Sequence, residues 1–153
     1  MMLTVGGHLG KTSDIVTPAV NAMLRHDVDE DVISAGLSFL TQLATEAPKV
    51  QELIVHTPAP DILLDIVFSG RADGRAEAAC LIALLVENPE NRRHMSQLMG
   101  RSGDQTYSIC RALSTALIAQ DSITDARAKT GAYDTRSAAS AALVYLARFW
   151  GTC

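Results

Sequence analysis

One segment of the chain has residue types that could bind a phosphate group. Residues 5–16 read VGGHLGKTSDIV, in which Gly10, Lys11 and Thr12 precede a stretch of helical periodicity. A phosphate-binding loop of the form G-x-x-x-x-G-K-[ST] needs a glycine five positions before Gly10, where this chain has Val5. Gly6 is one residue too close, so the loop is too short to enclose a phosphate in the usual way. A small helical nucleotide-binding protein that uses Gly10, Lys11 and Thr12 is therefore the alternative function.

Two carboxylates have a spacing that could support acid–base chemistry. Asp61 and Asp65 are four residues apart, which is one turn of the helix predicted there. Proton transfer in catalysis also needs a reacting group or a third side chain held against the pair. The sequence around the two aspartates supplies neither. We expect a solvated helix face rather than a catalytic pair.

The histidines and cysteines show no spacing typical of metal ligands. The chain has no H-E-x-x-H motif and no C-x-x-C motif. We therefore predict no metal site, no cofactor and no catalytic residue, and the chain is not expected to be an enzyme. The three cysteines are widely spaced, and the N-terminal residues lack the features of a secretory signal. Three reduced thiols and a cytoplasmic location, with the nucleus as the second choice, are the expectation.

Length and composition predict a folded domain that binds neither nucleic acid nor membranes. The chain has 153 residues, of which 48% are hydrophobic and 20% charged, so it is long enough and apolar enough for one buried core. The formal net charge of -4 argues against a broad basic surface for nucleic acid. No apolar run reaches the roughly 18 residues that a membrane-spanning helix needs.

Helical periodicity dominates, and no strand is predicted. Helices are expected at 12–25, 30–45, 49–56, 61–69, 76–87, 90–99, 104–119 and 135–150. Pro48 and the pair Asn88-Pro89 mark breaks between helices. The acidic residues near position 29 are expected to cap the helix that follows. Pro18 is tolerable only if the first helix begins close to it.

Two stretches of the chain are versions of the same helical unit. Asp29 corresponds to Asp73, Ala35 to Ala79, Leu40 to Leu84 and Ile54 to Leu98, and each pair is 44 residues apart. A third copy starts near residue 135, after a polar insertion at 119–135. A period of about 40–47 residues built from two or three helices is typical of armadillo and HEAT solenoids. We expect a lead-in at 1–11 that is flexible and one solenoid domain at 12–153.

These units resemble the armadillo repeat family, most closely in the tracts DEDVISAGLSFLTQLA and NPENRRHMSQLM. The resemblance implies an all-α, right-handed α-solenoid of about three armadillo-like helical repeats. It also implies a scaffold or interaction module that binds a partner protein or extended peptide in a concave groove lined by the third helix of each unit. The spacing alone also fits HEAT repeats or a simple α-bundle.

The resemblance places the partner-binding residues on the predicted third helices at 12–25, 61–69 and 104–119. The candidates are Asn21, Asp61, Asp65, Asp104, Tyr107 and Arg111. The groove carries more Asp than Arg, so it is expected to prefer a basic or neutral segment.

The repeat also predicts the core and one exposed end. The residues expected between the helical layers are Ala35, Leu40, Leu43, Ala79, Leu84, Ala139 and Leu146. The third copy stops before its third helix, which leaves apolar side chains uncovered at the C-terminal end. Phe149 and Trp150 are therefore candidates for docking a partner or a second copy of the chain. A chain cut from a longer repeat array is the other interpretation.

Overall fold

The fold is mostly helical, as the periodicity predicts. The computed structural model describes residues 5–25, 29–69, 72–102, 104–118 and 135–150. Across these ranges the chain forms the helices α1 (Val5–Arg25), α2 (Glu30–Glu46), α3 (Pro48–Val55), α4 (Ala59–Ser69), α5 (Ala72–Val86), α6 (Pro89–Ser96), α7 (Ile109–Ile118) and α9 (Thr135–Trp150). A two-stranded antiparallel sheet, β1 (Met99–Ser102) and β2 (Gln105–Ser108), lies between α6 and α7.

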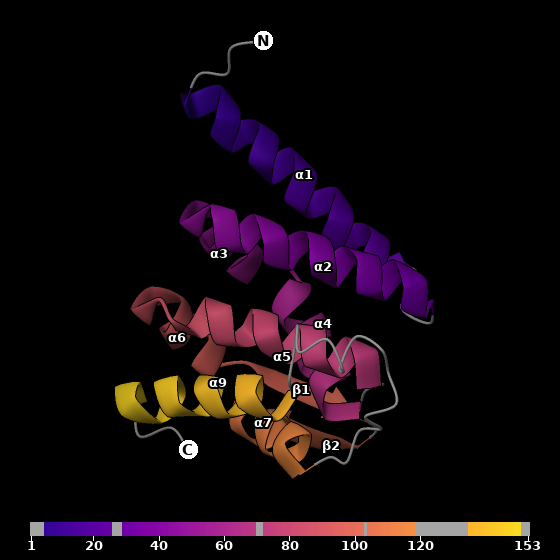
Figure 1. The fold of residues 1–153 in the computed structure, drawn as a ribbon, viewed down its shortest axis with the longest axis vertical. Helices are drawn as coiled ribbons and strands as arrows, with labels where there is room; N and C mark the ends of the chain where they lie inside the picture. The colour runs from indigo at the N-terminus through magenta and orange to yellow at the C-terminus, as the bar shows by residue number, and fades with distance from the viewer. Residues whose placement is uncertain (1–4, 26–28, 70–71, 103, 119–134, 151–153) are drawn as a thin grey trace.

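The helices are stacked along the long axis of the molecule (Figure 1). Helix α1 lies at one end, followed by α2 and α3, then α4 to α6, and α7 and α9 lie at the other end. Helix α5 packs against α2 on one side and α9 on the other. Contacts also join α3 to α6 and α4 to α7. Helices α2, α3 and α4 therefore each contact their counterparts in the next unit, α5, α6 and α7.

Local capping explains where two of the helices begin. The Asp29 carboxylate accepts hydrogen bonds from the backbone N–H groups of Asp31, at 3.0 Å, and Val32, at 3.3 Å. The predicted capping role of the acidic run is confirmed at this residue, because the side chain satisfies N–H groups that the helix itself leaves free. Asn88 does the same for α6, accepting from the N–H of Glu90 at 2.9 Å. Pro48 and Pro89 are the first residues of α3 and α6, where a missing N–H costs nothing.

Helix α1 begins earlier than the sequence predicts. It starts at Val5 rather than at residue 12, so part of the segment expected as a lead-in is helical, and residues 1–4 lie outside the described ranges. Pro18 therefore lies inside the helix and not near its first turn, which corrects that expectation. An interior proline costs roughly 3 kcal/mol. The buried face of α1, with Val16, Val20 and Met23, helps to offset this cost by packing on the core.

The hairpin is the main difference from the predicted secondary structure. A helix was expected from residue 104, whereas the chain pairs Gly100 with Tyr107 and Arg101 with Thr106 before α7 begins at Ile109. The run RSGDQTY has turn residues followed by a β-branched and an aromatic residue, which favours a hairpin over a helix. Ser108 then accepts a hydrogen bond from the Arg111 N–H at 3.2 Å and caps α7.

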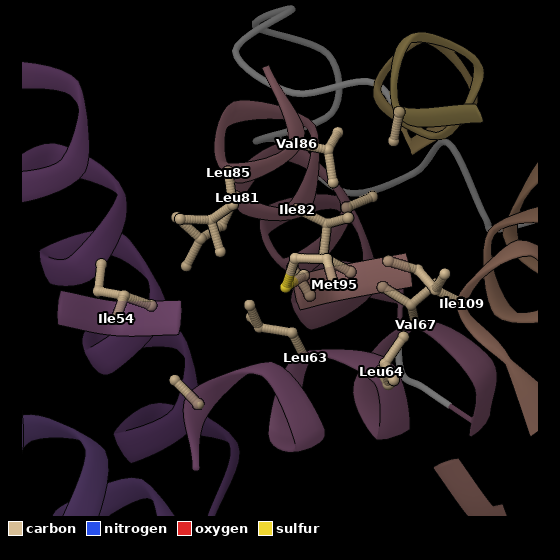
Figure 2. Close-up of a cluster of buried hydrophobic side chains, with 14 of the residues drawn as sticks. Ile54, Leu63, Leu64, Val67, Leu81, Ile82, Leu85, Val86, Met95 and Ile109 are labelled. Carbon is tan, nitrogen blue, oxygen red and sulfur yellow. The ribbon is translucent and has the colours of Figure 1, made fainter. Parts of the chain in front are cut away.

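The core lies between the stacked layers, and Figure 2 shows side chains of α4 and α5 gathered around Met95 of α6. Four residues predicted for the core are fully buried, namely Leu40, Ala79, Ala139 and Leu146. Leu43 and Leu84 are only partly buried against this core.

Helix α2 turns a different face to the core from the one predicted. Ala35, a predicted core residue, is exposed, and Phe39 of the predicted stripe is 39% exposed. The buried face carries Ile33, Leu37 and Leu40 instead. Leu40 belongs to both stripes, because a helix has 3.6 residues per turn and two adjacent apolar stripes overlap.

Candidate functional site

Four of the predicted partner-binding residues come together on one side of the molecule. Asp61 and Asp65 lie on α4, Tyr107 lies on β2, and Arg111 lies on α7. Helix α4 contacts both β1 and α7, so these elements form one continuous surface. We call it the α4–hairpin–α7 face and define it by these four residues and Phe68.

Helix α4 presents two carboxylates and one aromatic ring along a single side. Asp61, Asp65 and Phe68 are spaced by four and then three residues, so their side chains project from the same side of the helix. Both aspartates are exposed, whereas Phe68 is half-buried. The start of this helix is held by Thr57, whose hydroxyl accepts from the Ala59 N–H at 3.1 Å. Asp61 lies in the first turn, where the helix dipole stabilises a negative charge.

Tyr107 is the central residue of the face. Its ring stacks on that of Phe68, with centroids 3.9 Å apart and an angle of 10° between the planes. Across the hairpin it pairs with Gly100, and a Cβ atom at that position would overlap the ring atoms Cζ and Cε2 of the tyrosine. The ring therefore lies between α4 and the backbone of β1, and only 2% of the residue is exposed. A residue with any side chain at position 100 would prevent this arrangement.

The hydroxyl of Tyr107 is buried and has no hydrogen-bond partner among the described residues. Burial raises the pKa of Tyr107 to about 12, and the charges of Asp65 and then Asp61 add to the effect. Both carboxylates therefore lie close enough to disfavour a tyrosinate. The hydroxyl stays protonated at every pH at which the protein would normally work.

Arg111 supplies the positive charge of the face. Its guanidinium carbon is 5.9 Å from the centroid of the Phe68 ring, within the range of a cation–π interaction. The side chain is exposed. The face therefore combines two carboxylates, a stacked aromatic pair and one guanidinium, which suits recognition of polar and charged side chains. None of these groups is arranged as a nucleophile with an adjacent base.

The other predicted partner-binding residues are not part of this face. Asn21 lies on α1 and is half-buried, at the opposite end of the stack. Asp104 is exposed and lies at the turn of the hairpin, not on a helix as predicted. Phe149 and Trp150 belong to the last turn of α9, but their side chains lie outside what the structure describes.

One residue of the face, Phe68, and one residue that supports it, Gly100, were missed from the sequence. Phe68 could have been found, because its spacing from Asp61 and Asp65 places it on the same side of α4. Gly100 could not, since its role depends on a cross-strand pair within a hairpin that the sequence did not predict.

A second polar cluster joins α5 to α9 and has a structural role. The Arg92 Nε donates to the Val86 carbonyl at 2.8 Å, and Nη2 donates to the Glu87 carbonyl at 2.9 Å. These carbonyls end α5, where a cation also interacts favourably with the helix dipole. The guanidinium carbon lies 5.5 Å from the Tyr145 ring centroid, and the Tyr145 hydroxyl donates to Glu87 Oε1 at 3.4 Å. Arg92 therefore fixes the end of α5 and supports α9.

The cysteines differ from the expectation of three reduced thiols. Cys80 is a free thiol, but Cys110 is disulfide-bonded, to a partner that is not among the described residues. Burial and then the charge of Glu77 raise the pKa of Cys80, so its thiol is a poor nucleophile.

Two histidines lie close together without forming a metal centre. The rings of His56 and His94 are 5.1 Å apart and edge to face. Among the residues that the structure places, no group of three or more His, Cys, Asp or Glu side chains is arranged to hold a metal ion. Within the same ranges, no helix has both the length and the apolar character needed to cross a bilayer.

Comparison with protein-family models, curated proteins and solved structures finds no match to this chain. The resemblance to the armadillo family therefore stays a prediction from the sequence repeat.

Proposed function

We propose that this chain is a non-enzymatic interaction module or scaffold. In this proposal its helical units stack as an armadillo-like, right-handed solenoid, and a partner protein or extended peptide binds at the α4–hairpin–α7 face. The partner is a protein, and no nucleic acid, membrane or cofactor is involved.

The observation that carries the proposal is the contact between corresponding helices of successive units. Helices α2, α5 and α9 contact one another in order, and α3 contacts α6 as α4 contacts α7. Two segments that shared only a hydrophobic pattern would not be expected to pack with each helix of one segment against the corresponding helix of the other. In solenoids this stacking builds an extended surface, which such proteins use for binding.

The composition of the face supports its choice as the binding surface. Asp61, Asp65 and Arg111 are exposed charged side chains on two neighbouring helices. Beside them, the half-buried Phe68 ring is held in place by stacking on Tyr107, which is itself buried. Aromatic residues and arginine are enriched among the residues that dominate binding energy at protein interfaces.

The nucleotide-binding alternative gains no support from the fold. Gly10, Lys11 and Thr12 lie within α1, well after its first turn. In a helix the backbone N–H groups at such positions donate to carbonyls one turn back and are not available for a phosphate. A thermal shift with ATP or GTP plus Mg²⁺ that disappears in Lys11→Ala would nevertheless favour this alternative over a binding module.

Selection from a random peptide display library tests the proposal directly. The full chain is the target, and the affinity of each selected peptide is measured by fluorescence anisotropy. Arg111→Glu should weaken binding at least about tenfold, because it reverses a charge within the face. Glu52→Lys, a charge reversal at an exposed position on α3, serves as the matched control and should leave binding unchanged. Failure to select any peptide, or binding that Arg111→Glu does not affect, would overturn the proposed face.

A further inference from the structure

We propose that the partner segment binds in an extended conformation and adds a third strand to the sheet, along the outer edge of β2. The inference rests on the proposed function, since it states how the α4–hairpin–α7 face holds a partner peptide. Main-chain hydrogen bonds to the edge of the hairpin supply the affinity in this mode of binding.

The first observation is the pairing register of the hairpin. Ser102 pairs with Gln105, so two residues form the turn, and the pair next to such a turn is hydrogen-bonded. Hydrogen-bonded and non-hydrogen-bonded pairs alternate along an antiparallel ladder, so Arg101 and Thr106 form a non-hydrogen-bonded pair. The backbone N–H and C=O of Thr106 therefore point away from β1, out of the edge of the sheet. Neither group bonds to another residue that the structure describes.

The second observation is which edge of the sheet is open. Helix α4 packs against β1. The ring of Tyr107 reaches across Gly100 of β1 to stack on Phe68 of α4, so β2 is the strand farther from that helix. Gln105 and Thr106 of β2 are exposed. In the described part of the chain the sheet has two strands, so no third strand there pairs with the outer edge of β2.

The composition of β2 favours pairing with another strand. Natural sheets commonly protect an open edge with charged side chains or proline. Residues 105–108 read QTYS and carry neither, whereas β1 contains Arg101. Threonine and tyrosine also favour the extended conformation. The four residues of β2 are therefore suited to pair with a short extended peptide.

The added strand also explains how neighbouring side chains contribute specificity. Alternate side chains of a strand point to opposite faces of the sheet. One set of partner side chains lies on the Tyr107 side, which is also the side of Arg111, because Arg111 lies over the Phe68 ring on which Tyr107 stacks. A neutral or acidic residue is expected there. The other set lies on the side of Thr106, where a β-branched residue makes a favourable cross-strand pair.

An N-methyl scan of the bound peptide tests the inference. Peptides are selected on the full chain, and each backbone N–H of the best binder is methylated in turn. Methylation removes a donor and adds bulk, so every second position along the paired segment should lose affinity at least about tenfold, as expected for a lost hydrogen bond. The positions between them face away from β2 and should stay within about threefold of the parent peptide.

Two measurements on the protein locate the contact. In saturated complexes the Thr106 amide hydrogen should exchange at least about tenfold more slowly than in the free chain, whereas the Arg101 amide should be unaffected. Thr106→Pro removes the outward N–H at an edge position, where proline is tolerated, and should weaken binding at least about tenfold. Arg101→Pro makes the same change on the opposite edge and should leave affinity unchanged. Because the N-methyl scan uses the unaltered protein, it decides the matter if either proline variant fails to fold.

The outcomes separate this inference from the proposed function. Peptides that bind in a manner sensitive to Arg111→Glu, but without a two-residue period in the scan or without protection of the Thr106 amide, would overturn the inference alone. Sensitivity every three to four residues would show a helical partner and would also overturn it. Protection of Thr106 that rises with protein concentration in the absence of peptide would assign the edge to a second copy of the chain, again against the inference. If no peptide is selected, both the inference and the proposed function fail.

Discussion

The ring of Tyr107 lies nearly parallel to the ring of Phe68, with centroids 3.9 Å apart. The two residues come from different elements, β2 and α4, so the stack joins the hairpin to the helical layers. Such pairs contribute about 0.5–1.5 kcal/mol beyond the area they bury. This contact is also what holds the tyrosyl hydroxyl near the carboxylates of α4.

Gly100→Ala should destabilise the protein, because the added Cβ would overlap the Tyr107 ring, which is stacked on Phe68. The expected loss is about 1–3 kcal/mol, as for other overpacked sites, and urea unfolding measures it. Gly74→Ala is the matched control. Its Cβ would be 3.3 Å from Ile66 Cγ2 inside α5, where alanine favours the helix, so its cost should be smaller or reversed. Equal losses of unfolding free energy in Gly100→Ala and Gly74→Ala would contradict the placement of the Tyr107 ring against Gly100.

The pH dependence of stability should report the environment of Tyr107. Its pKa is about 12 in the folded protein and 10.0 without the fold, so between these values the folded state holds a proton that the unfolded state has lost. Stability from this group is fully present below pH 10 and is lost as the pH rises towards 12. Urea unfolding of the wild type and Tyr107→Phe at pH 8 to 12 measures the difference. If both proteins lose stability equally over this interval, the tyrosine does not titrate as described.

Two neighbouring leucines of α5 should differ in importance. Leu85 is fully buried, whereas Leu84 is only partly buried against the core. Leu85→Ala should cost about 2–5 kcal/mol through lost transfer free energy and the cavity left behind. Leu84→Ala should cost roughly 1–2 kcal/mol, since a half-buried side chain loses less on truncation. The reverse order in denaturant unfolding would place the buried face of α5 elsewhere.

Arg92→Gln should destabilise the packing of α6 against the end of α5. It removes the two hydrogen bonds that the guanidinium donates to the Val86 and Glu87 carbonyls. The expected loss of unfolding free energy is about 1.5–3 kcal/mol, the range for hydrogen bonds from charged donors. Lys49→Gln, at an exposed position on α3, is the control and should stay within about 0.5 kcal/mol of the wild type. If Arg92→Gln and this control have the same free energy of unfolding, the hydrogen bonds from Arg92 to the end of α5 do not contribute to stability.

Self-association through the C-terminal end stays a prediction that light scattering can test. Val144 on α9 is 47% exposed, which adds a described apolar side chain to those expected at this end. A concentration-dependent rise in mass is expected for the wild type and should be lost in Trp150→Ser or Val144→Ser. A strictly monomeric wild type at high concentration would rule out the homotypic contact.

Local signals were sufficient to predict most of the helices. Asp29, Asn88 and the prolines at 48 and 89 mark helix ends through hydrogen bonding and the loss of an N–H, which depend only on neighbours in sequence. The repeat likewise gave the right position for α9. The rotation of α2 was misjudged because Leu40 fits two adjacent stripes, and only packing against α5 decides between them.

The candidate site was predicted in part. Asp61 and Asp65 share a side of α4 by helical spacing alone, so their pairing could be read from the sequence. Their meeting with Tyr107 depends on a hairpin held by cross-strand pairing and by a non-local stack on Phe68. The sequence analysis placed Tyr107 near Asp61 and Asp65 because it predicted a helix at residue 107. In the structure Tyr107 lies near them because the hairpin brings it to α4.

The order in which the helices stack determines which helices can unfold locally and which unfold only together with their neighbours. Helix α5 is packed on both sides by its counterparts α2 and α9, whereas α1 contacts mainly α2 and α3 at one end. Amide hydrogens of α5 should therefore exchange with solvent only when several units come apart together. Those of α1 should exchange through fraying that leaves the rest intact. The chain would then lose structure from its N-terminal end inward, while the α4–hairpin–α7 face, anchored to α5 through α4, keeps its shape.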